Sequence, residues 1–249
     1  MDGALDILTC GDNDDVRRLR TQSQDLIDLL ARRALEDGGR VRRVVGLREL
    51  VAQLRAIEPM ATRSSRVMQP AYAYDPEDPG VQLTRSARLR GVETELITRP
   101  VTVRTHPLLS SIFPATMLGP CFLRAMMIDE KSVLVGGPDD LEGNRTSWFT
   151  TLPEAVDAVR DLWHATVPHC RPILAAGQKP PLTERQLDVA RLLCVGEKDK
   201  AIARLLRLSA RTVEREVSAI LGQLGAGSRT EAVLMMRGRG VNGGGAGGR

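Results

Sequence analysis

Apolar residues recur at helical spacing along the first quarter of the chain. Between residues 12 and 36 six of them fall on one helical face, and the glycine pair that follows ends the helix. They are Val16, Leu19, Leu26, Ile27, Leu30 and Ala34. A second helix is expected from residue 46 to about residue 64, with an inward face made by Leu47, Leu50, Val51, Leu54 and Ile57. Each helix either packs on its own domain or contacts a partner.

The middle of the chain alternates between strand and helix patterns. Strands are expected at residues 66–73, 92–97 and 147–150, and a hairpin over residues 123–135 that turns at residues 129–131. Helices are expected at residues 81–90 and, opened by Pro153 in its first turn, at residues 154–165. Helices that alternate with strands predict an α/β domain, here over residues 1–174.

The last quarter contains the start and stop signals of four short helices. Capping boxes at Thr183 with Gln186 and at Ser228 with Glu231 open the first and the fourth. The second is expected at residues 198–206, and Ser209 caps a third that runs to about residue 224. Two helices joined by a tight turn, the second rich in arginine, are typical of a protein that places one helix in the DNA major groove.

Basic residues gather in the same part of the chain. The formal net charge of the 249 residues is +4, but residues 181–249 alone carry 12 basic and 7 acidic side chains. This asymmetry favours a polyanion-binding module, although a merely soluble basic surface is the other interpretation. The stretch at residues 175–181, AAGQKPP, is interpreted as a linker, and the glycine-rich residues 238–249 as a disordered tail.

The third of these helices supplies the candidate groove residues. Arg215 points away from its apolar arc and is flanked by Arg211 and Ser218, and arginine can donate two hydrogen bonds to guanine. The cations of the second helix and the turn are better placed to hold phosphates. The candidate DNA-binding residues are Lys198, Lys200, Arg204, Arg207, Ser209, Arg211, Thr212, Glu214, Arg215 and Ser218. Glu214 either accepts from a cytosine amino group or forms a solvated pair with Arg211 or Arg215, and we favour the pair.

Five motifs in unbroken order carry a family resemblance. They are L-T-x-R from Leu182, K-x-I-A from Lys200, L-S-x-x-T-V from Leu208, I-L-x-x-L-G from Ile220 and S-R-x-E-A from Ser228. The module closely resembles the LuxR-type helix-turn-helix domain of bacterial transcription regulators. That resemblance implies an all-α four-helix DNA-binding domain over residues 182–237, whose third helix enters the major groove and whose fourth commonly dimerises. Asp199, Glu214 and Glu216 depart from the usual Asn, basic residue and His.

The order of elements in the N-terminal part, with R-G-V at residues 90–92 and a hairpin with an acidic turn, resembles the phospholipase-D-like domain. That domain accompanies LuxR-type helices in some actinobacterial regulators, where it also resembles the TrmB sensor region. Phospholipase D chemistry needs H-x-K, because the histidine attacks phosphorus and the lysine neutralises the phosphate. None of His106, His164 and His169 has a lysine two positions on. The domain is therefore expected to be non-catalytic, with His106 in a surface loop. The pattern of a phosphoacceptor receiver domain also fails.

Other chemistry is disfavoured. The four cysteines form no C-x-x-C pair, so neither a metal site nor a cofactor is expected, and the chain is not expected to be an enzyme. No apolar run approaches membrane-spanning length and the first residues are acidic, which predicts a cytoplasmic protein without a membrane partner.

The leading hypothesis is a bacterial transcription regulator that binds double-stranded DNA as a homodimer, with an N-terminal sensory domain for an unidentified small-molecule effector. Its dimer would form through Val233 and Met236, or through Leu19 and Leu26. The alternative is a degenerate phospholipase-D-like scaffold that tethers weakly and nonspecifically to DNA.

Overall fold

The computed structural model describes residues 13–36 and 39–238. Contacts divide the chain into two units. The first, called the sheet unit here, comprises Met1–Ala71, Pro79–Pro100 and Ala115–Pro172, and the second, the helical unit, comprises Tyr72–Asp78, Val101–Pro114 and Ile173–Arg249. The backbone therefore passes between the two units five times.

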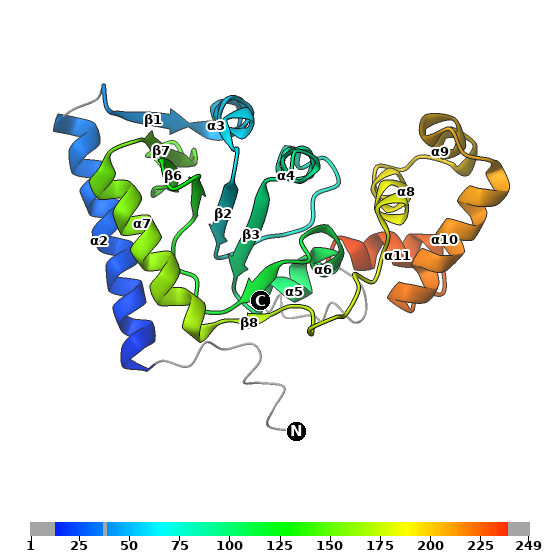
Figure 1. The fold of residues 1–249 in the computed structure, drawn as a ribbon. Coiled ribbons are helices and arrows are strands. Elements are labelled where there is room, and N and C mark those ends of the chain that lie inside the picture. The colour runs from blue at the N-terminus through cyan, green and yellow to red at the C-terminus, as the bar shows by residue number, and fades with distance from the viewer. Residues whose placement is uncertain (1–12, 37–38, 239–249) are drawn as a thin grey trace. The chain divides into compact units, whose positions relative to one another are not determined.

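The sheet unit is built on a mixed sheet, most of whose strands are labelled in Figure 1. The strand order is β1-β7-β6-β5-β2-β3-β4-β8. β2, β3 and β4 run parallel, and the other neighbouring strands pair antiparallel. The strands are β1 (Val41–Val45), β2 (Ser64–Gln69), β3 (Glu93–Thr98), β4 (Thr116–Leu118), β5 (Ala125–Ile128), β6 (Ser132–Gly136), β7 (Thr146–Thr150) and β8 (Arg171–Pro172). This confirms the expected mixed α/β class of the N-terminal part.

Two helices cover one face of this sheet, α2 (Asp14–Glu36) and α7 (Pro153–Thr166), which lie against each other (Figure 1). Alternate strand residues such as Val135 and Trp148 join Leu30 of α2 and Trp163 of α7 in the main core. Helices α3 (Gly46–Ile57) and α4 (Pro79–Leu89) contribute to two smaller clusters formed with residues of the opposite register, Leu134 among them. The unit therefore has a core on each side of the sheet.

The first amphipathic helix is confirmed, but its apolar face is already used. Leu19 and Leu26 are each 3% exposed and belong to the main core. They cannot form a dimer surface without opening that core, so this candidate surface is wrong.

The second helix ends earlier than expected. It stops at Ile57, and a 3-10 turn, Glu58–Met60, follows because Pro59 has no amide hydrogen with which to continue an α-helix. Its expected inward face is also partly wrong, because Leu47 in the first turn is 69% exposed while Gln53 is buried.

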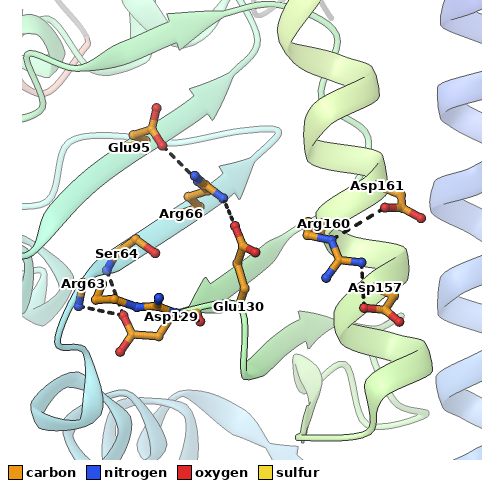
Figure 2. A network of polar contacts seen from close by, with 9 residues as sticks. All are labelled: Arg63, Ser64, Arg66, Glu95, Asp129, Glu130, Asp157, Arg160 and Asp161. Carbon is orange, nitrogen blue, oxygen red and sulfur yellow. Dashed lines mark hydrogen bonds and ion pairs between the residues drawn. The ribbon is translucent and has the colours of Figure 1, made fainter.

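Polar groups, not apolar ones, hold the hairpin turn between β5 and β6. Asp129, in the left-handed region with φ 51°, accepts hydrogen bonds from the amides of Arg63 and Ser64, each at 2.8 Å (Figure 2). It also accepts from the amide and the hydroxyl of Thr62. Burial alone would raise the pKa of Asp129, but these hydrogen bonds hold it well below its usual range.

Next to that turn, Arg66 of β2 joins three elements. Its guanidinium donates to Glu95 of β3 at 3.0 Å and to Glu130 of the turn at 2.5 Å (Figure 2). The acidic residues of the turn are thus engaged in fixing the hairpin to the parallel strands.

Candidate DNA-binding surface

Four helices follow residue 183, as expected. They are α8 (Glu184–Cys194), α9 (Asp199–Leu206), α10 (Ala210–Leu224) and α11 (Arg229–Met236). Thr183 opens α8 with a complete capping box, in which the Gln186 amide donates to the threonine hydroxyl and the Gln186 side chain accepts from the Thr183 amide. Ser228 caps α11 by accepting from the amide of Glu231 at 3.2 Å. Val189, Leu193, Ile202, Val213, Ile220 and Met236 are buried between these helices.

The connection between α9 and α10 is a tight turn. Arg207 adopts the left-handed conformation, with φ 55°, and the Leu208 amide donates to the carbonyl of Ala203 at 2.8 Å. Ser209 then caps α10 by accepting from the Thr212 amide at 3.1 Å. The helix-turn-helix geometry expected from the sequence therefore forms through local hydrogen bonds.

The candidate residues lie on these two helices and their turn. All are exposed except Thr212, which is half-buried and shares a hydrogen bond with Ser209. Residues 198–218 contain six basic and three acidic side chains. Two of the acids are already paired, Asp199 with Arg229 and Glu216 with Arg215, so the uncompensated charge of this surface is positive.

The pairing expected for Glu214 is wrong. Within the described residues its carboxylate has no ion pair, and its carbonyl accepts from the Ser218 hydroxyl at 2.9 Å. Arg215 instead turns to Glu216, at 3.1 Å. The reason is burial, because Glu216 is only 7% exposed and a buried carboxylate needs partners more than an exposed one does.

Glu216 is a residue that the sequence analysis did not place in the site. Besides Arg215, it accepts from the Gln186 side chain at 3.2 Å and lies 3.9 Å from the guanidinium of Arg185. Its position was visible in the sequence, since residues 213, 216 and 220 share one helical face and the other two are apolar.

The fourth helix does not present the residues expected to dimerise. Met236 is fully buried, with its sulfur 4.0 Å from that of Cys194, and Val233 is half-buried. Leu234 is 45% exposed on the same helix. The assignment of Met236 to a dimer surface is therefore wrong, because the short helix uses it to pack on α8.

Two segments from the N-terminal part complete the helical unit. Ser111, from Val101–Pro114, accepts from the Leu182 amide at 3.1 Å just before α8. Burial raises the pKa of the Cys194 thiol on α8 to about 11, and Arg237 and, to a smaller extent, Tyr74 from Tyr72–Asp78 act against that rise.

His106 lies inside this unit and not in a surface loop. It is 1% exposed, and its ring centroid lies 5.0 Å from that of Tyr72, 5.3 Å from Tyr74 and 6.3 Å from Phe113. Burial lowers its pKa to about 4, so the neutral ring is the form present at neutral pH. The expectation of a surface histidine was wrong because aromatic residues from two separate segments enclose the ring.

Within residues 13–36 and 39–238 no group of three or more His, Cys, Asp or Glu is placed to hold a metal ion. Cys121, Cys170 and Cys194 form no disulfide among the described residues, while Cys10 and nearly all of the expected glycine-rich tail lie outside them. No described helix is long and apolar enough to cross a membrane.

Comparison with known proteins identifies the domain that contains the helix-turn-helix. The model of the luxR family of bacterial regulatory proteins matches residues 180–236, which confirms the LuxR-type domain expected from the motifs. The transcriptional regulatory protein YdfI of Bacillus subtilis is 43% identical over 60 residues, which are 24% of this chain. The chain thus spans 28% of the length of that protein.

Solved structures similar to this chain include Nuc of Salmonella typhimurium, a phospholipase D family member. It is 15% identical with a TM-score of 0.42, over 54% of this chain and 98% of Nuc. TrmBL2, an archaeal chromatin protein, is 15% identical with a TM-score of 0.37, over 57% of this chain and 59% of TrmBL2. Neighbours of both expected kinds, phospholipase-D-like and TrmB-like, are therefore present.

Proposed function

We propose that this chain is a transcription regulator that binds selected sites in double-stranded DNA through α10. The observation that carries the proposal is the set of exposed cations on α9, α10 and their turn, within a domain that matches the luxR family. Arg211, Arg215 and Ser218 share one side of α10 and are proposed to face base edges. Lys198, Lys200, Arg204 and Arg207 are proposed to hold phosphates.

Site selection from a random duplex library at physiological salt, with the full chain, tests this proposal. We expect enrichment of related sequences with two half-sites. The alternative of a nonspecific tether on a scaffold predicts no enrichment and an affinity that depends only on salt and duplex length. A variant with Arg211 and Arg215 both changed to Gln serves as control and should retain salt-dependent binding while losing the enriched sequence.

We further propose that two copies bind each site. One recognition helix of this length reaches few base pairs, so useful affinity requires a second half-site. The surface is left open, since Leu19, Leu26 and Met236 are buried within one copy. Light scattering of the complex should give, after the mass of the duplex is subtracted, a protein mass of twice 27.2 kDa, and a protein mass of one copy per operator would contradict this.

The sheet unit is proposed to be a non-catalytic sensory part of the same regulator. The absence of an H-x-K motif supports the proposal that the unit is non-catalytic. A phosphodiesterase assay on the purified chain should therefore show no turnover above buffer.

Connectivity supports the sensory half of this proposal. Tyr72–Asp78 follows the carboxyl end of β2, and Val101–Pro114 follows that of β3. Ligands of open α/β sheets bind at the carboxyl ends of parallel strands, and the chain continues from the ends of β2 and β3 into segments of the helical unit, so a small molecule bound to the sheet unit is proposed to act through these connections. Operator affinity measured with and without a ligand found by screening the full chain should differ by a factor of about 5 to 150.

A further inference from the structure

Glu216 is a carboxylate on the buried, otherwise apolar face of α10. It lies in the middle of α10 with Val213 three residues before it and Ile220 four residues after it, and all three are buried. Removing a charged group from water costs free energy unless hydrogen bonds and opposite charges replace the water. The partners of Glu216 therefore indicate why the chain retains a charge here.

These partners come from two helices. One carboxylate oxygen accepts from Nε2 of Gln186 at 3.2 Å. Gln186 is itself fixed, because its Oε1 accepts from the Thr183 amide at 2.9 Å in the capping box of α8. The orientation of the carboxylate on α10 is thus set by the first turn of α8.

Two guanidinium groups meet at the other oxygen. Nη2 of Arg215 lies 3.1 Å from it, and Nη1 of Arg185 lies 3.9 Å from it. Both arginine side chains are largely exposed, at 71% and 57%, while that of Glu216 is 10% exposed. Each guanidinium has five donors, so most of them face solvent beside a carboxylate that fixes the position of the group.

We propose that Glu216 is a positioning residue that holds Arg215 and Arg185 together, and that Arg185 is a further DNA contact on a phosphate next to the base that Arg215 reads. The proposal rests on the proposed function, since it assumes that α10 enters the groove. Arg185 lies on α8, outside the helix-turn-helix itself; α8 packs on α10, and the shared carboxylate lies between the guanidinium groups of Arg185 and Arg215.

This arrangement predicts a response that a purely structural role for Glu216 would not give. In Glu216→Gln the negative charge beside the arginines is lost, so affinity for random DNA should rise. Arg215 would also lose its anchor and sample more rotamers, so the preference for the selected site over random DNA should fall about tenfold. A structural role alone would lower thermal stability and weaken both kinds of binding together.

The test is fluorescence anisotropy with the full chain on the selected duplex and on a random duplex, at several salt concentrations. Glu197→Gln is the matched control, because it removes the same charge from the turn before α9, where the side chain forms no hydrogen bond or ion pair within the described residues. It should change random binding in the same direction but leave the ratio of selected to random affinity within about twofold.

Arg185→Gln tests the proposed phosphate contact, and it changes an exposed side chain that the fold does not need. Its plot of log affinity against log salt should be shallower by about one per subunit on both duplexes. In an Arg215→Gln background, adding Glu216→Gln should not lower the ratio further, because the positioning effect acts through Arg215.

If a folded Glu216→Gln protein keeps the same ratio of selected to random affinity, Glu216 does not position Arg215. If Arg185→Gln keeps the same salt slope, Arg185 is not a phosphate contact. If Glu216→Gln does not fold, the slope of Arg185→Gln decides the proposal by itself. Failure of the proposed function looks different, because the unaltered chain would then select no site.

Discussion

Arg215 and Lys200 should respond differently to truncation, because one is proposed to read a base and the other to hold a phosphate. Arg215→Ala should lose about 1 to 3 kcal/mol on the selected site and relax specificity at one base position per half-site. Lys200→Ala should weaken binding to all sequences alike and reduce the salt slope by about one per subunit. Titrations on selected and random duplexes measure both, and equal losses on the two duplexes for Arg215→Ala would make it a phosphate contact.

Asp129 should matter for stability at neutral pH. Asp129→Asn removes the charge that four hydrogen-bond donors face, and should lower the free energy of unfolding by about 1 to 3 kcal/mol. Asp157→Asn, which removes an exposed ion pair with Arg160 on α7, is the control and should change little (Figure 2).

The pH dependence of this contribution has a definite sign. The pKa of Asp129 is lower in the folded chain than in the unfolded chain, where it is about 3.9. Its contribution is therefore complete above that value and is lost as the pH falls toward the folded pKa. Urea unfolding from pH 7 down to pH 3 should give a shallower acid loss for Asp129→Asn than for the unaltered chain, and parallel curves would contradict this.

At the scale of elements, the end of β6 depends on two glycines for different reasons. A Cβ at Gly137 would lie 2.6 Å from the ring of Trp148, which is enclosed in the core, and 2.7 Å from the hydroxyl of Thr146. A Cβ at Gly136 would lie 2.4 Å from Nε of Arg124, whose half-buried side chain can move aside. Gly137→Ala should therefore destabilise by about 1 to 3 kcal/mol and Gly136→Ala by less. Denaturant midpoints compare the two, and the reverse order would show that Arg124 is held more rigidly than the ring.

At the scale of the whole molecule, the C-terminal helices should be weaker alone than in the full chain. A fragment without residues 1–176 lacks Tyr72–Asp78 and Val101–Pro114, so the Leu182 amide loses its Ser111 acceptor and Cys194 loses Tyr74. We expect a folded fragment that melts at a lower temperature and binds the selected site more weakly.

Circular dichroism melts and anisotropy compare the fragment with the full chain. Ser111→Ala in the full chain is the matched variant, because it leaves the same amide unpaired and should cost about 1 to 3 kcal/mol. A fragment as stable and as tightly bound as the full chain would show that the two segments contribute nothing to the helical unit.

Much of this molecule follows from spacing and capping along the chain. The four C-terminal helices, their caps at Thr183, Ser209 and Ser228, and the turn between α9 and α10 depend on residues within a few positions of each other. The same holds for α2, α4, α7 and the β5–β6 hairpin. These elements were predicted because their hydrogen bonds and apolar faces are local.

Other features depend on residues that are distant in the sequence. β1, with two arginines in five residues, and the short β4 and β8 have no strand pattern of their own and form because a neighbouring strand offers free backbone groups. Tertiary packing also decides which side chains are buried, as it does for His106, Leu19 and Leu26. It likewise decides that Arg215 pairs with the buried Glu216. A sequence determines which faces are apolar or charged, whereas only the packed chain decides which of those faces lose contact with water and therefore require a partner.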